Sequence, residues 1–269
     1  VYIPLPNSLH REWTIRAAQA GKHVLCEKPL ALDAAECEEM AAAADDAGVK
    51  LMEAFMYRFH PRTERVLEML REGRIGRVGA VRSAFTFRLR SQENIRLDPD
   101  LGGGALMDVG CYCVNVSRTL VGEEPVEVQA SAHWSDRNVD DFMAGMLRFP
   151  GGATAHFDCA LTLERSEAYE VAGTDGQLRV ASAFLPGTDD VEIVEARGRD
   201  GESVHPIAGD DEYRLMVEHF ADCVLHDREP RYGATEAAAN MRVIEALYRS
   251  ARTGRAVEVT RAGTTDPGR

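Results

Sequence analysis

The first 55 residues alternate between short apolar runs and longer segments with apolar positions at helical spacing. The apolar runs predict three strands, at residues 1–5, 23–26 and 49–55, and the segments between them predict helices over residues 9–20 and 34–47. Asp33, with Glu36 three residues later, is the usual start signal of a helix. Strands that alternate with helices form parallel sheets joined by right-handed crossovers. Residues 1–55 are therefore expected to form a parallel α/β unit.

From residue 56 onward the pattern changes to β-rich runs with fewer helices between them. Strands are expected at residues 78–89, 126–135, 142–149, 153–163, 169–172 and 191–195, and helices at residues 61–73, 102–121, 212–225 and 235–251. Hairpin turn signals at residues 149–152 and 173–176 indicate antiparallel pairing. Residues 56–269 are therefore expected to form an α+β domain with a large, mainly antiparallel open sheet. Whether the terminal helices pack back on the first domain is left open.

The charge and the cysteines exclude several classes of function. A formal net charge of -13 without any basic run excludes a nucleic-acid partner, because phosphate binding needs a concentrated Lys/Arg face. No run approaches the roughly 18 apolar residues of a membrane span. The six cysteines are scattered, so a reducing cytoplasm is expected. Cys111 and Cys113 form one C-x-C without a second ligand pair, and no metal site is expected.

The segment Glu27-Lys28-Pro29 directly follows the strand predicted at residues 23–26. Open parallel sheets bind ligands at the carboxyl ends of their strands, so a charged pair held there by a proline is well placed for catalysis or binding. The same tripeptide also fits a solvated ion pair in front of a helix. The pattern alone leaves both interpretations open.

A second motif joins the glycines of residues 102–104 to the helix predicted over residues 102–121. Asp108, Tyr112 and Asn115 stand at helical spacing and are expected to line one stripe of that helix. Either a functional face or a solvated one explains such a stripe. The glycines allow another backbone or a ligand to approach the helix start closely.

The third motif is the loop at residues 4–10, which leaves the first predicted strand. Asn7 stands where a residue often caps the following helix, and a ligand contact is the alternative. His10 lies in the first turn of that helix.

These three motifs, in this order, resemble the glucose-fructose oxidoreductase/inositol dehydrogenase (Gfo/Idh/MocA) family. The segments that carry the resemblance are VYIPLPNSLH, AGKHVLCEKPL and GGGALMDVGCY. Asp108 and Tyr112 stand four positions apart, as in the branch that holds dimeric dihydrodiol dehydrogenases, glucose-fructose oxidoreductase and NADP-dependent xylose dehydrogenases. The resemblance implies a Rossmann domain, followed by an α/β domain whose open sheet forms a homo-oligomer interface. It also makes Pro29 a candidate for a cis peptide bond.

The resemblance further implies an NAD(P)-dependent oxidoreductase that transfers a hydride between NADP or NAD and a sugar (aldose) or related diol. Lys28 resembles the catalytic lysine and Tyr112 the acid/base, with Asp108 orienting the pair. A tyrosine with a pKa of about 10 ionises near neutrality only beside a cation, and we expect Lys28 to be that cation. The implied cofactor contacts are Pro6, Asn7, His10, Glu27, Lys28 and Arg96. The implied substrate contacts are Tyr57, Arg58, Asn94 and Tyr112.

One departure from the family concerns the G-x-G-x-x-G turn, which is expected upstream in this family and does not occur in the sequence. We therefore expect an N-terminally truncated Rossmann domain that lacks its first βαβ unit and binds cofactor weakly. Two rival functions stay open. One is a non-catalytic sugar- or dinucleotide-sensing protein that keeps the fold, and the other is a structural role through the open sheet.

Overall fold

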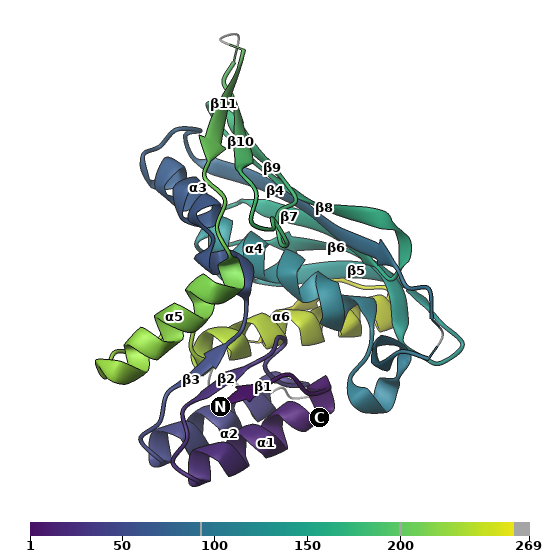
Figure 1. The fold of residues 1–269 in the computed structure, drawn as a ribbon. Helices are drawn as coiled ribbons and strands as arrows, with labels where there is room; N and C mark the ends of the chain where they lie inside the picture. Colours follow the sequence, from purple (N-terminus) through teal and green to yellow (C-terminus); the bar gives the residue numbers. More distant parts are fainter. Residues whose placement is uncertain (92, 199–200, 261–269) are drawn as a thin grey trace.

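Two sheets organise the computed structural model, which describes residues 1–91, 93–198 and 201–260. The smaller sheet is parallel and has the strand order β1-β2-β3, and the larger one has nine strands in the order β11-β10-β9-β8-β4-β7-β6-β5-β12 (Figure 1). In Figure 1 the small sheet and its helices lie below the large sheet. The fold is a Rossmann-like unit followed by a large, mainly antiparallel sheet, as the sequence predicts.

The small sheet contains β1 (Tyr2–Ile3), β2 (Val24–Cys26) and β3 (Leu51–Glu53), joined by α1 (Asn7–Gln19) and α2 (Ala34–Asp46). All five predicted elements are present, and the Asp33 side chain accepts the Glu36 N–H at 2.8 Å, as the start signal predicts. The capping role considered for Asn7 is wrong, because α1 begins at this residue and Pro6 occupies the cap position without a side-chain hydrogen bond.

The large sheet contains β4 (Val78–Arg88), β5 (Glu127–Trp134), β6 (Asp140–Arg148), β7 (Thr154–Ala160), β8 (Thr162–Gly173), β9 (Gln177–Ala181), β10 (Val191–Ala196), β11 (Glu202–Ile207) and β12 (Val257–Glu258). Strands β4 and β7 pair in parallel, and the other neighbours pair antiparallel. The mainly antiparallel prediction is therefore confirmed.

Two expectations about individual strands are wrong. The strand predicted at residues 153–163 ends at Ala160. The strand predicted at residues 169–172 is only the end of a longer strand, residues 162–173, which runs along β4. The sequence analysis also missed β9, β11 and β12. Strand β11 is polar and largely exposed, and it lies at the edge of the sheet, so its apolar pattern is weak.

The remaining α-helices of the described residues are α3 (Pro61–Arg71), α4 (Cys111–Val121), α5 (Glu212–Leu225) and α6 (Ala234–Thr253). Shorter helical turns are η1 (Met56–Phe59), η2 (Ile95–Leu97), η3 (Pro99–Leu101) and η4 (Leu106–Gly110). Helices α4 and α6 contact the large sheet, and α6 also packs against α2 of the first unit. There the Ala34 N–H donates to Glu245 at 2.6 Å, and Arg242 pairs with Glu38. The terminal helix α6 therefore packs back on the first part of the chain.

The two faces of the large sheet differ. Side chains alternate along a strand, so in β4 the buried Val81 and Phe85 point toward the helices, whereas Arg82 and Ala84 point to the opposite face. In the described part of the chain no helix covers that opposite face (Figure 1). Among the described residues, no helix is long and apolar enough to cross a membrane.

Candidate active site

The carboxyl ends of β1 and β2 lie side by side because the two strands pair in parallel, with Ile3 opposite Cys26. The loop after Ile3 and the segment Glu27-Lys28-Pro29 therefore leave the same edge of the small sheet. The peptide bond between Lys28 and Pro29 is cis, as expected. This edge is where open α/β sheets bind their ligands.

His10 connects these two loops from inside the protein. Its side chain is fully buried, and its ring nitrogens lie 3.0 Å from the Pro29 carbonyl oxygen and 2.8 Å from the Leu5 carbonyl oxygen. Burial lowers the pKa of His10 below its usual value, against the opposing effect of the carbonyls. His10 thus holds the two loops of this edge in place.

Lys28 reaches from its loop to the helical segment that carries Asp108. Its Nζ donates to the backbone carbonyl oxygen of Asp108 at 2.7 Å, lies 3.4 Å from Oδ1 of the same residue, and stands 5.0 Å from the ring centroid of Tyr112. Burial alone would lower the pKa of Lys28, but the Asp108 carboxylate leads the charges that raise it above its usual value. Lys28 is therefore a fixed cation.

Asp108 bridges two cations. It lies in a π-helical turn, η4 (Leu106–Gly110), directly before α4. While one carboxylate oxygen faces Lys28, Oδ2 accepts a hydrogen bond from Arg96 Nε at 2.6 Å. Arg96 comes from the loop before the glycines, and its guanidinium lies 5.8 Å from the ring of Phe87. The carboxylate is held on both sides, which fixes its orientation.

Gly102 and Gly103 each allow a different neighbour to lie close to the backbone. A Cβ on Gly103 would lie 2.5 Å from the Arg96 carbonyl oxygen, and one on Gly102 would lie 2.9 Å from Cβ of Asn7. The Gly102 carbonyl in turn accepts a hydrogen bond from Asn7 Nδ2 at 2.8 Å. The neighbours that the glycines admit are therefore backbone and side chains of the protein, which ties the Arg96 loop to α1.

Tyr112 lies one turn after Asp108 and is only 4% exposed. Its ring packs against Phe55, Phe85 and Phe184 at centroid distances of 5.0, 5.3 and 5.4 Å, and its hydroxyl donates to Met56 Sδ at 3.4 Å. Burial raises the pKa of Tyr112 well above its usual value. Burial therefore outweighs the effect expected of Lys28, and Tyr112 keeps its proton.

These side chains line a cleft of about 510 Å³ between the small sheet and the large one. Six of the predicted site residues face it: Asn7, Glu27, Lys28, Arg96, Asp108 and Tyr112. Several further residues that the sequence analysis missed also line it, among them Tyr2, Phe85, Phe87, Arg165, Leu185 and Tyr213. The alternation of side chains between the two faces of β4 could have indicated that Phe85 and Phe87 lie on one face. Nothing in the sequence near the motifs points to Arg165 or Tyr213, which lie far along the chain.

Five predicted site residues do not line this cleft: Pro6, His10, Tyr57, Arg58 and Asn94. Tyr57 is fully buried and donates to Asn115 Oδ1 at 2.7 Å, and Arg58 pairs with Glu236 at 3.0 Å. Asn94 accepts the Arg96 N–H at 3.0 Å through its side chain. These residues support the walls of the cleft.

The predicted polar stripe is also not a single face. Asp108 and Tyr112 face the cleft, whereas Asn115 is fully buried and contacts Tyr57 and Glu236. Tyr112 and Asn115 both lie in α4 but stand three positions apart, which turns their side chains about 60° from one another around the helix axis. Among the residues that the structure describes, no cluster of His, Cys, Asp and Glu is arranged to hold a metal ion.

A parallel α/β unit, an open antiparallel sheet and a Lys–Asp–Tyr cluster in the cleft between them define a two-part oxidoreductase. Residues 1–55 match the oxidoreductase family with an NAD-binding Rossmann fold, and residues 63–179 match the GFO/IDH/MocA C-terminal domain. The chain belongs to the Gfo/Idh/MocA oxidoreductase family, which confirms the resemblance seen in its motifs.

Known relatives are similar over nearly the whole chain. D-xylose 1-dehydrogenase (NADP(+)) 2 of Haloferax volcanii is 44% identical over 262 residues, which cover 96% of this chain and 80% of the relative. The aldose-aldose oxidoreductase of Caulobacter crescentus, solved with glycerol, matches with a TM-score of 0.88 and 37% identity, over 96% of this chain and 78% of that one. A 3-ketoreductase of Actinomadura kijaniata, solved with NADP and TDP-benzene, matches with a TM-score of 0.88 and 32% identity, over 93% and 77%.

Proposed function

We propose that this protein is an NADP-dependent sugar dehydrogenase that acts on an aldose or a related diol, with Lys28, Asp108 and Tyr112 as its catalytic residues. The observation that carries the proposal is the placement of Lys28 Nζ, 2.7 Å from the Asp108 carbonyl and 5.0 Å from the Tyr112 ring, at the ligand-binding edge of the small sheet. A binding protein needs no such buried cation beside a phenol, whereas proton transfer to or from a hydroxyl does.

The three side chains divide the proton chemistry between them. Tyr112 holds its proton at neutral pH, so it is the donor to a carbonyl oxygen in the reductive direction. Lys28 stays charged and stabilises negative charge on a substrate oxygen, the charge that develops when a hydroxyl loses its proton. Asp108 keeps Lys28 in place through its carbonyl and its carboxylate. Positioned groups of this kind typically contribute about 10²- to 10⁴-fold in rate.

The residues present fit the nicotinamide half of the cofactor. When bound, that group accepts or supplies the hydride. Asn7, Glu27 and Lys28 are the cleft residues at the strand ends that would hold it, and Arg96 also lines the cleft. The cleft volume of about 510 Å³ is within the range of small-molecule sites. The sequence has no G-x-G-x-x-G turn for the pyrophosphate, so the proposed contacts are limited to this half.

The names of the relatives support a sugar as substrate and NADP as cofactor. The similarity to a D-xylose dehydrogenase and to an aldose-aldose oxidoreductase makes an aldose the first substrate to test. The Actinomadura ketoreductase was also solved with a lysine and with a tyrosine replaced, and these two residues are 84 positions apart, as are Lys28 and Tyr112. That spacing supports the assignment of the catalytic pair.

The test is a titration of NADPH, followed by intrinsic fluorescence, against this chain and against a version that includes any coding sequence upstream of Val1. Saturable binding by either protein supports the proposal. A sensing protein is the alternative, and Tyr112→Phe separates the two: a dehydrogenase loses most of its turnover with its fold intact, whereas a sensor loses no more than one hydrogen bond in ligand affinity. No binding of NADPH by either version would contradict the nicotinamide assignment.

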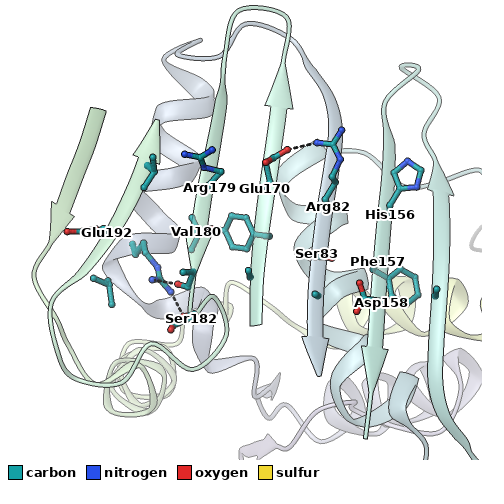
Figure 2. Close-up of a pocket in the computed structure, with 18 of the residues that line it drawn as sticks. Arg82, Ser83, His156, Phe157, Asp158, Glu170, Arg179, Val180, Ser182 and Glu192 are labelled. Carbon is teal, nitrogen blue, oxygen red and sulfur yellow. Dashed lines mark hydrogen bonds and ion pairs between the residues drawn. The ribbon is translucent and has the colours of Figure 1, made fainter. Parts of the chain in front are cut away.

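We also propose that a second copy of the chain packs on the uncovered face of the large sheet. A hollow of about 950 Å³ lies on this face, and Figure 2 shows Arg82, His156 and Glu170 among the residues that line it. Ala84 and Ala168 pair directly across β4 and β8 and contribute only small side chains to its lining. Such a surface, with charges of both signs around small side chains, suits a copy of itself. Ala84→Arg should convert a dimer to a monomer in light scattering, while Arg65→Glu on α3 should not.

We also propose a division of the chain into two parts and a location in the cell. The division of the chain between residues 55 and 56 into a cofactor part and a substrate part is supported by the separate sheets. A cytoplasmic location is supported by the six cysteines, which are all buried and free. Limited proteolysis and fractionation of the source cells test these two points.

A further inference from the structure

Asp140 is a buried carboxylate outside the cleft that contacts the start of the helix bearing Asp108 and Tyr112. It is the first residue of β6 and is 1% exposed. Oδ2 accepts the N–H of Leu106 at 2.7 Å, and Oδ1 accepts the hydroxyl of Tyr248 from α6 at 2.8 Å. Leu106 is the first residue of the π-helical turn. Asp140 therefore acts at the beginning of the segment that carries the proposed catalytic residues.

This helix start has no cap of its own. The first N–H groups of a helix lack intrahelical acceptors, and a polar side chain just before the helix usually supplies one. Here Gly104 and Ala105 precede the helix, and neither has a polar side chain. The acceptor comes instead from Asp140, 34 positions later in the sequence. A negative charge at a helix N-terminus is also favoured by the helix dipole.

The third glycine of the G-G-G motif makes room for this carboxylate. A Cβ on Gly104 would overlap Oδ1 of Asp140 and would lie 2.9 Å from the Tyr248 hydroxyl. The backbone of Gly104 has φ of +125°, a conformation that other residues rarely adopt. The motif that marks the site in the sequence thus includes a residue whose place is set by Asp140.

Burial of the Asp140 carboxylate removes it from water, which is unfavourable. Burial raises the pKa of Asp140 to about 7, although the bonds from Leu106 and Tyr248 oppose this effect. No cation is paired with it among the described residues. A neutral side chain in this position would avoid the cost of burying a charge. The titratable groups that interact with it are Asp141 on its own strand, Tyr248 on α6 and Cys159 on β7. Cys111 on α4 interacts in turn with Tyr248 and Cys159.

We propose that Asp140 is a positioning residue, whose carboxylate, oriented by Tyr248, sets the place of the Asp108–Tyr112 helix so that the Asp108 carbonyl meets Lys28. This inference rests on the proposed function of Lys28, Asp108 and Tyr112. Lys28 belongs to the small sheet, whereas the helix lies on the large sheet, so a shift of the helix start changes the distance between the reacting groups directly. Displacements of about 1 Å cost up to about 10²-fold in rate.

The test uses two readouts that need no turnover. Hydrogen exchange reports on the Leu106 amide, and NMR of ε-¹³C-labelled lysine reports on Lys28, which is easily resolved because the chain has only three lysines. In Asp140→Ala the Leu106 amide should exchange about 10-fold faster, as expected for a lost cap. The Lys28 signal should also move and titrate at lower pH, because Nζ loses the Asp108 carbonyl.

Asp140→Asn is the conservative variant, and it should restore both readouts, since its amide oxygen still accepts from Leu106. Asp141→Asn, one residue along and bonded to His133, is the matched control. If Asp140→Ala fails to fold, Tyr248→Phe should show smaller shifts in the same direction.

Unchanged exchange at Leu106, or a Lys28 signal that stays in place in Asp140→Ala, would overturn the positioning role. Exchange that rises uniformly over all helices would do the same, because it indicates a general loss of stability. A wild-type protein that gives the expected exchange and NMR results but never turns over a sugar would count against the proposed function alone.

Discussion

Lys28 meets Asp108 mainly through the backbone: its Nζ lies 2.7 Å from the carbonyl oxygen of Asp108 and 3.4 Å from the carboxylate. The carboxylate binds Arg96 more closely, at 2.6 Å. The two functions of Asp108 are therefore separable. Its carbonyl holds the lysine, and its carboxylate joins the lysine to the arginine.

This separation predicts a mild phenotype for Asp108→Asn. The carbonyl contact with Lys28 survives, while the charge that raises the pKa of Lys28 is lost. The pKa of Lys28 should fall, and turnover should decline about 10-fold, less than the loss expected for a removed acid/base. Kinetics across a pH series, together with lysine NMR, checks both points. Full loss of activity in Asp108→Asn would show that the carboxylate takes part in the reaction itself.

Tyr112→Phe should abolish most activity without unfolding the protein. The ring keeps its contacts with Phe55, Phe85 and Phe184, and the lost hydrogen bond goes only to a methionine sulfur, a weak acceptor. We expect turnover to fall by about 10²- to 10⁴-fold and the melting temperature to stay nearly constant. Phe85→Leu, which lines the same cleft without a titratable group, is the control. Equal activity of Tyr112→Phe and the wild type would remove Tyr112 from the mechanism.

Glu53 makes stability depend on pH. Its side chain is fully buried at the end of β3 and accepts the Leu30 N–H at 2.8 Å, and burial together with the nearby Glu236 raises its pKa from 4.5 to about 8. Because the folded-state pKa is the higher one, the stabilising contribution is full below pH 4.5 and is lost as the pH rises through about 8.

Glu53→Gln should therefore gain stability over the wild type as the pH rises from 5 to 9, by an amount on the order of a few kcal/mol at most. The amide oxygen of the variant still accepts from Leu30. Thermal unfolding of both proteins across this pH range measures the difference. A constant difference at all pH values would mean that Glu53 ionises with an ordinary pKa.

Gly103→Ala should disturb the site by displacing the loop that carries Arg96. Its new Cβ would lie 2.5 Å from the Arg96 carbonyl oxygen and would push the loop that carries Arg96 away from Asp108. We expect a rise in KM and a loss of stability of about 1–3 kcal/mol, which is typical of overpacking. Gly79→Ala is the matched control, because its Cβ would meet nothing nearer than 3.8 Å. Identical kinetics for the two variants would contradict the role assigned to the glycine.

The sequence was informative where a motif is local. The segment Glu27-Lys28-Pro29 lies at a strand end, and strand ends of a parallel sheet converge, so the place of Lys28 follows from neighbouring residues. The pair Asp108 and Tyr112 follows from helical spacing in the same way. The two-part fold was predictable because the hydrophobic period changes near residue 56.

Contacts between distant parts of the chain were not predictable. The resemblance implies that Tyr57 and Arg58 contact the substrate, yet the 3₁₀ turn buries both, Tyr57 against Asn115 of α4 and Arg58 against Glu236 of α6. Asn115 leaves the expected stripe because it contacts Tyr57 and Glu236, which come from distant parts of the chain. Arg165 and Tyr213 reach the cleft from elements whose place depends on the whole fold.

The most direct test of the proposed function is the formation of NADPH from NADP⁺ and D-xylose by the protein together with any natural upstream sequence, measured alongside Lys28→Ala and Tyr112→Phe. The account predicts turnover by the wild type with D-xylose or another aldose of the panel, and a loss of about 10²-fold or more in both variants. Turnover that survives in both variants, or NADPH binding without oxidation of any aldose or diol, would contradict it.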